Sequence, residues 1–253
     1  MIIFRYDKTF EGLLTAVFEA YQRKIFPDQL LADGESAPLF VGTDVHIDTN
    51  EEYAARVWRG AERRLSGTAR AMVICCWLSE LPEADILLFR FFRKTFDTPY
   101  MEINFGDPDI LELSKIGKRV NGEKHRMLQF LRFQKTEDGT FFAPVEPLYN
   151  VLPLAVSHFR DRFADQPWLI YDIRRHYGYY YDLNVVSEIS FTDAENHLIT
   201  GLLDDRLMDK DERLFQKLWK TYFRATAIAE RTNPRKQRGD MPVRYWKYLT
   251  EKQ

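Results

Sequence analysis

The sequence has little cysteine and little histidine, and both shortages exclude classes of metal site. Of 253 residues, only two are cysteine and five are histidine. Cys75 and Cys76 are adjacent, so they leave no Cys-rich ligand set for a structural zinc ion or an iron–sulfur cluster. Neighbouring cysteines rarely bridge each other, which indicates buried, inert thiols in a reducing compartment. We therefore expect no metal, no bound cofactor and a cytoplasmic location.

Long hydrophobic runs and nucleotide-binding motifs are also missing. The most apolar stretch, residues 71–89, is interrupted by acidic residues and a proline and is too broken to span a bilayer. The first residues, MIIFRYDKTFEG, lack the basic and apolar regions of a secretory signal. No Gly-x4-Gly-Lys-Ser/Thr, Gly-x-Gly-x-x-Gly, His-Glu-x-x-His or Gly-x-Ser-x-Gly sequence occurs. ATPase, Rossmann dehydrogenase, zinc protease and esterase functions thus lose their main support.

What the sequence does contain is typical of a globular protein. Hydrophobic residues make up 45% and charged residues 29%, enough for a real core. The net charge of −2 excludes the global basic field of a histone-like nucleic-acid binder. The aromatic share of 15% is high, and these rings require either a large core or a stacking surface.

Apolar periodicity and capping residues predict a mixture of helices and strands. Helices are expected after the caps Thr9 and Asn50, after Pro153, and over 211–230. Asp138–Gly139 predicts a hairpin between strands 128–134 and 140–145. Further strands are expected over 2–6, 168–173, 177–182 and 185–191. Because this order is not a regular βαβα alternation, the sequence predicts a helix-rich α+β fold with a small, mainly antiparallel sheet in the C-terminal two-thirds.

Pro82 is the predicted domain boundary. It separates an N-terminal α/β subdomain, residues 1–82, from a C-terminal α+β domain, residues 83–253. The C-terminal domain ends in a basic and aromatic tail over residues 231–248.

One segment, HFRDRFADQPWLIYDIRRHYGYYYD, places charged residues among many rings. His158 and Arg162 share a helical face, and Asp172 lies in a mostly apolar strand next to Arg175. A buried carboxylate requires a partner, so these four residues are candidates for a catalytic or phosphate-binding pocket. The competing interpretation is a structural ion pair that locks the helix to the sheet.

The tail combines cations with aromatic rings. Cations that contact phosphates, next to rings that stack on bases, are typical of single-strand or damaged-base recognition. The alternative interpretation is a solvated basic C-terminal segment whose aromatic rings pack onto the rest of the protein. The candidate nucleic-acid-binding residues are Arg231, Arg235, Lys236, Arg238, Arg244 and Trp246.

Three segments in order, YDKTFEGLLTAVFEAY, HFRDRF…WLIYDIRRHYG and TNPRKQRGDMPVRYWKYL, carry a family resemblance. The chain resembles, over essentially its whole length, a bacterial family of DNA repair or DNA metabolism proteins with a C-terminal domain of unknown function, family 4130. The resemblance implies a genomic neighbour, a radical SAM protein similar to spore photoproduct lyase. Some members are fused to a uracil-DNA glycosylase domain, and this chain resembles the unfused form. The family assigns no roles to the matching positions, which are His158, Phe159, Arg162, Phe163, Trp168, Asp172, Arg175 and Gly178.

Residues and resemblance together predict a DNA repair or DNA modification protein that works beside a radical SAM partner and away from membranes. Its expected ligand is nucleic acid, with single-stranded or damaged DNA as the candidate form. Two alternatives stay open. The protein could be a non-catalytic adaptor for the radical SAM enzyme, or an enzyme acting on a small phosphorylated metabolite. Whether it is an enzyme is not decided by the sequence.

Overall fold

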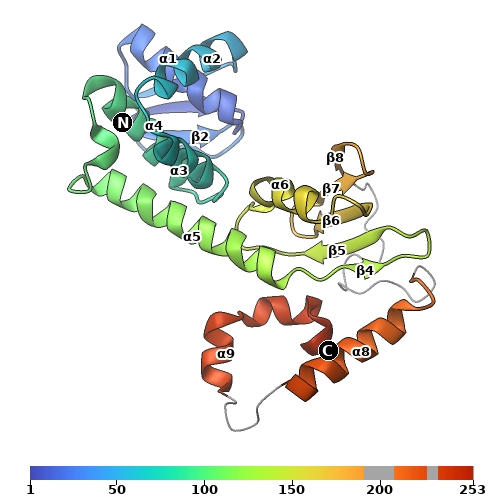
Figure 1. Ribbon diagram of the computed structural model, residues 1–253. Coiled ribbons are helices and arrows are strands. Elements are labelled where there is room, and N and C mark those ends of the chain that lie inside the picture. Colours follow the sequence, from blue (N-terminus) through green and yellow to red (C-terminus); the bar gives the residue numbers. More distant parts are fainter. Residues whose placement is uncertain (191–207, 227–232, 253) are drawn as a thin grey trace. The chain divides into compact units, whose positions relative to one another are not determined.

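The computed structural model describes residues 1–190, 208–226 and 233–252 (Figure 1). The chain forms two compact units, Met1–Asn121 and Gly122–Gln253, and the division falls inside helix α5, Pro108–Phe130. Helices alternate irregularly with two small sheets, so the predicted helix-rich α+β class is confirmed. The predicted domain boundary at Pro82 stays a prediction.

The first unit contains a three-stranded parallel sheet. Its strands are β1 (Ile2–Tyr6), β2 (Gln29–Ala32) and β3 (Thr43–His46), in the order β2-β1-β3. The predicted strand over 2–6 is therefore the central strand, and Phe4 and Tyr6 are fully buried on it. A parallel pair requires a crossover, and helix α1 (Phe10–Arg23) supplies it between β1 and β2.

Helices complete the first unit, and side-chain caps begin three of them. Thr9 accepts a hydrogen bond from the Gly12 amide at the start of α1, as the sequence predicts. In the same way, Asn50 caps α2 (Glu51–Glu62) and Ser66 caps α3 (Gly67–Trp77). The remaining elements are α4 (Ala84–Asp97) and the 3₁₀ turn η1 (Met101–Ile103).

The two cysteines lie within α3 and both are buried, as predicted. Burial raises the pKa of Cys76 to about 12, so its thiol stays protonated at neutral pH. The Cys76 Sγ contacts the backbone oxygen of Leu113 on α5 at 3.2 Å. The pair is thus part of the core.

The second unit contains a five-stranded sheet in the order β4-β5-β6-β7-β8. Its strands are β4 (Gln134–Lys135), β5 (Phe141–Val145), β6 (Trp168–Asp172), β7 (Tyr177–Tyr181) and β8 (Val186–Ile189). All pairs are antiparallel except β5 and β6, which helix α6 (Leu152–Arg162) connects in parallel. The predicted mainly antiparallel sheet is confirmed.

The hairpin at Asp138–Gly139 is present, but its first strand is short. Helix α5 continues to Phe130 and β4 holds Gln134 and Lys135 only, so the predicted strand over 128–134 is wrong except at Gln134. No glycine or proline stands between residues 123 and 133 to end the helix earlier. Gly139 adopts a left-handed φ of 87°, which the turn requires.

The unit ends in three helical segments and a short turn. They are α8 (Glu212–Thr226), α9 (Pro234–Asp240), η3 (Val243–Tyr248) and η4 (Thr250–Lys252). Two rings of the tail, Tyr245 and Tyr248, pack inward and are buried, as is Leu249 directly after them. Within the residues described, no helix has both the length and the apolar character needed to cross a membrane.

Candidate functional site

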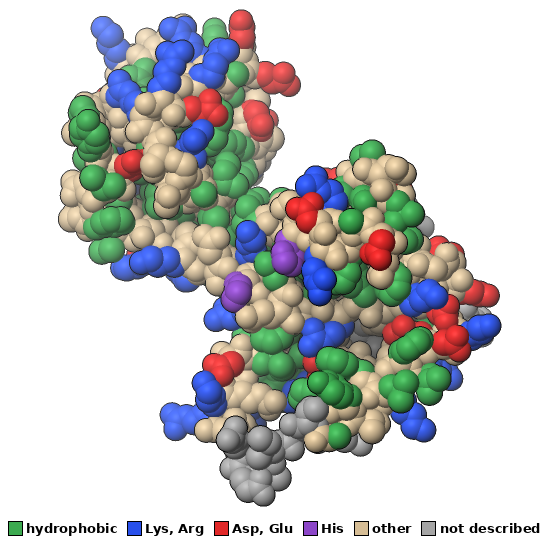
Figure 2. Space-filling model, viewed as in Figure 1, with side chains coloured by type: hydrophobic (Ala, Val, Ile, Leu, Met, Phe, Trp, Pro, Cys, Tyr) green, Lys and Arg blue, Asp and Glu red, His purple; other side chains and the backbone are tan. Residues whose placement is uncertain are grey.

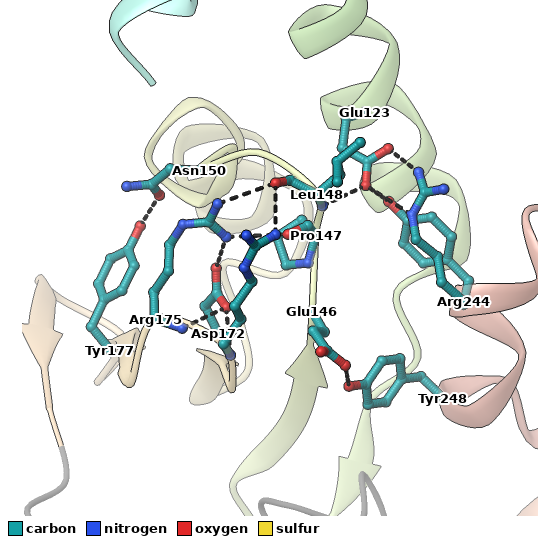
Figure 3. Close-up of polar contacts among 12 residues, drawn as sticks. Glu123, Glu146, Pro147, Leu148, Asn150, Asp172, Arg175, Tyr177, Arg244 and Tyr248 are labelled. Atoms are coloured by element: carbon teal, nitrogen blue, oxygen red, sulfur yellow. Dashed lines mark hydrogen bonds and ion pairs between the residues drawn. The ribbon is translucent and has the colours of Figure 1, made fainter. Parts of the chain in front are cut away.

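Three parts of the second unit, distant in sequence, send polar side chains to the segment Glu146–Asn150 (Figure 3). They are the C-terminal half of α5, the β6–β7 hairpin and the tail. The segment follows β5 and carries Pro147, so its backbone leaves the sheet and its carbonyl groups need partners from other elements. The contacts therefore fix the tail to the sheet.

Glu123 on α5 is the centre of the contacts to the tail. Its carboxylate is 1% exposed and accepts hydrogen bonds from the Leu148 amide at 2.9 Å, from the Tyr245 hydroxyl at 2.8 Å, and from the Arg244 guanidinium. Burial alone would raise the pKa of Glu123, but these donors outweigh it and hold the pKa below its ordinary value. The tail is thus anchored by a buried, ionised carboxylate.

Asp172, at the end of β6, is fully buried and pairs with Arg175 at 2.9 Å. Its other oxygen accepts the backbone amides of Arg174 and Arg175 at 3.0 and 3.1 Å, which closes the β6–β7 turn. Burial raises the pKa of Asp172, and the bonds from Arg175 offset part of that rise. The Arg175 guanidinium also donates to the backbone oxygens of Pro147 and Leu148.

The structure does not bring His158 and Arg162 to Asp172. Both lie on the exposed side of α6, where the imidazole ring contacts Phe159 and the Arg162 guanidinium lies 5.8 Å from the ring centre of Phe163. Arg162 ends α6, before β6 begins, whereas Asp172 ends β6, about 13 Å further along that strand. Only Asp172 and Arg175, of the four predicted residues, form a direct pair, and catalytic roles for the four stay a prediction.

A cationic pocket of about 410 Å³ opens beside this network. Among the described residues, its cations are Arg174 from the β6–β7 turn and Arg244 and Lys247 from η3, and its acid is Glu146. Glu146 accepts from Lys247, and this hydrogen bond lowers the pKa of the carboxyl group. Three cations against one acid give the pocket a net positive charge. Hereafter we call Arg174, Arg244 and Lys247 the cationic pocket.

The other predicted tail residues divide into two groups. Arg235, Lys236 and Arg238 are exposed on α9, and Lys236 forms a surface ion pair with Asp240. The indole N–H of Trp246 donates to the Met241 carbonyl, and the ammonium of Lys252 lies 4.9 Å from the ring centre of Trp246. Arg231 lies outside the described residues.

Sequence reasoning missed Glu123, Glu146 and Arg174. Glu123 lies in a run of helical charged residues, GEKHR, where an exposed position is the default interpretation. Its partner Arg244 is 121 residues away, so no local spacing reports the pair. Among the described residues, no group of three or more histidine, cysteine or acidic side chains is arranged to hold a metal ion.

Comparison with known proteins gives one match. A family model described as a domain of unknown function, DUF4130, matches residues 82–251. No curated protein and no solved structure matches. The match begins at the start of α4 and includes the whole polar network, the cationic pocket and α8. Since it covers well over half of the sequence, the chain belongs to the DUF4130 family.

Proposed function

We propose that this protein binds single-stranded or damaged DNA and acts in DNA repair or modification beside a radical SAM partner. The observation that supports the proposal is the convergence of Arg174, Arg244 and Lys247 in one pocket, in the unit that also carries the exposed cations of α9. The pocket and α9 together supply six cationic side chains within one unit of a protein whose net charge is −2. Such a local concentration of positive charge suits a phosphate backbone. The family resemblance supplies the repair context.

Different cations have different roles in this proposal. Arg235 and Arg238 are exposed and are available to contact phosphates by small movements of their side chains. Arg244 and Lys247 are oriented by Glu123 and Glu146 and present their outer donors to the pocket. Asp172 and Arg175 hold the turn that carries Arg174, one of the cations of the pocket. No reacting group is assigned to this chain, and the chemistry is assigned to the partner.

The test measures the affinity of the full chain for a single-stranded oligodeoxynucleotide over a range of salt concentrations. Arg235→Ala with Arg238→Ala is expected to weaken binding and to reduce the slope of log K against log salt by about 1.4, since each lost contact with a single strand removes about 0.7. Arg59→Ala with Arg63→Ala, on the exposed face of α2 and just after it, changes the net charge equally and serves as the control.

Equal losses for both double variants would mean that only overall charge matters, and would refute a site in the tail. Absence of binding by the wild-type protein at low ionic strength would refute the proposal as a whole. If the wild-type protein did not bind DNA but formed a stable complex with the radical SAM partner, the adaptor function would replace the proposed DNA-binding function.

A further inference from the structure

A large apolar groove lies in the second unit, away from the cationic pocket. Its volume is about 1300 Å³, and it lies between α8, the start of β4–β5 and the end of α6. Seven apolar side chains line it, and six of them carry aromatic rings. They are Phe133, Phe141, Phe163, Phe215, Leu218, Trp219 and Tyr222.

The α8 side of this groove is exposed, although it is apolar. Phe215, Leu218 and Tyr222 are 63%, 55% and 60% exposed. In Figure 2, hydrophobic side chains, coloured green, gather over α8. A contiguous apolar strip of this kind on a helix marks a binding surface, because a helix that only had to fold would bury it.

A hydrogen bond to a buried carboxylate orients the indole ring of Trp219. Its indole N–H donates to Glu251 at 2.9 Å, and the other oxygen of Glu251 accepts from Arg132 at 2.7 Å. Burial alone would raise the pKa of Glu251, but the bonds from Arg132 and Trp219 hold the pKa below its ordinary value, so the carboxylate stays charged. Because the indole donor is already used, what Trp219 offers to a ligand is its ring surface.

Two guanidinium groups lie over rings of the groove. The guanidinium of Arg132 is 5.8 Å from the ring centre of Trp219, and that of Arg162 is 5.8 Å from the ring centre of Phe163. Lys135 also lines the groove and pairs with Asp209. Aromatic rings with guanidinium groups in contact with them match a nucleotide, whose flat base is joined to a negative phosphate.

We propose that this groove stacks the unpaired bases of a single strand, with Trp219 as the principal stacking ring. The proposal rests on the proposed function and adds a second, separate contact to it: the cationic pocket and α9 bind phosphates, and the groove binds bases. It also gives Arg162, which lines the groove, a role in the base site. A duplex, whose bases are already stacked on one another, cannot use the groove.

The experiment compares two strands with equal numbers of phosphates. One is an oligodeoxythymidine of about 12 nucleotides, within the usual site size of about 4–16, and the other is the same length without bases. The wild-type chain is expected to bind the thymidine strand about 5- to 150-fold more tightly for each stacked base. Trp219→Ala should remove most of that preference and leave the affinity for the abasic strand unchanged.

Two controls separate stacking from damage to the fold. Trp219→Phe keeps a ring and should retain most of the preference. Tyr100→Ala removes a ring that is 82% exposed in the first unit and should change neither affinity. Circular dichroism of each variant should match the wild type, because Trp219 lies on the exposed face of α8.

Each other outcome overturns the inference. Equal binding of both strands by the wild type would leave the proposed function intact and refute base stacking. Binding of neither strand at low salt would refute both. If sedimentation showed a dimer that Trp219→Ala converts to monomers, the groove would be an interface between two copies of the chain.

Discussion

Removing the Glu123 carboxylate should release the tail from the sheet. Loss of one member of a buried ion pair costs about 3–5 kcal/mol when both groups are fully buried. The Arg244 side chain is 38% exposed, so water can solvate the cation that is left behind and reduces the cost. We therefore expect Glu123→Ala to lower the free energy of unfolding by about 2–3 kcal/mol, the larger part because the Leu148 amide and Tyr245 hydroxyl lose their acceptor.

Urea unfolding of the full chain, followed by circular dichroism, measures this loss. The urea concentration at the midpoint of unfolding should fall by about 1 M, because the free energy of unfolding typically decreases by about 1–3 kcal/mol per M of urea. Hydrogen exchange localises the effect: the amides of Tyr245 and Leu249, which form the bonds of η3, should exchange faster in the variant. Glu112→Gln on the same helix is the control, since its exposed pairs with Lys115 and Arg119 are worth at most about 1 kcal/mol.

The stability of the protein should depend on pH through the same carboxylate. The pKa of Glu123 in the folded protein is below its ordinary value of 4.5. The stability that it contributes is therefore complete above that ordinary value and is lost as the pH falls through the lowered folded pKa. In Glu123→Gln, the free energy of unfolding should fall less steeply as the pH is lowered through this range. If Glu123→Ala and Glu112→Gln were equally stable, the tail would not be held by the buried pair, and the description of the site would be wrong.

Other parts of the structure predict simpler outcomes. Gly178→Ala should destabilise the protein by about 3 kcal/mol in urea unfolding, because an added Cβ would lie 2.4 Å from the Ile170 oxygen on β6; a stable variant would contradict the β6–β7 register. Cys75 and Cys76 should react with a thiol reagent only after unfolding, since both are buried; rapid labelling of the native protein would show otherwise. Asp172→Asn should cost less stability than Asp172→Ala, because an asparagine oxygen can still accept the two turn amides; equal losses would mean that charge alone matters there.

The parts of the fold that the sequence predicts are those with local signals. Thr9 and Asn50 begin helices because their side chains accept amide hydrogen bonds three residues on, a pattern visible in the sequence. Asp138–Gly139 marks a turn because glycine tolerates the left-handed φ. The parallel pairing of β5 with β6 has no such local mark, since it depends on how α6 packs across the sheet.

The candidate site was harder to predict for the same reason. The partner of Asp172 is three residues away, and sequence reasoning included Arg175 among its possible partners. The Glu123–Arg244 pair joins residues 121 positions apart and could not be predicted without the fold. Helical periodicity identified the apolar residues of α8, but periodicity cannot tell whether an apolar stripe is buried or exposed.

The most direct test of the central claim, that the second unit binds a single strand through phosphates and bases, is photocrosslinking. The full chain is irradiated with a single-stranded oligodeoxynucleotide that contains 4-thiothymidine, and the crosslinked peptides are identified by mass spectrometry. We predict crosslinks to the groove, within residues 132–141 and 215–222, and to the tail, within residues 233–247. Crosslinks confined to residues 1–121, or none under conditions in which the strand is bound, would contradict it.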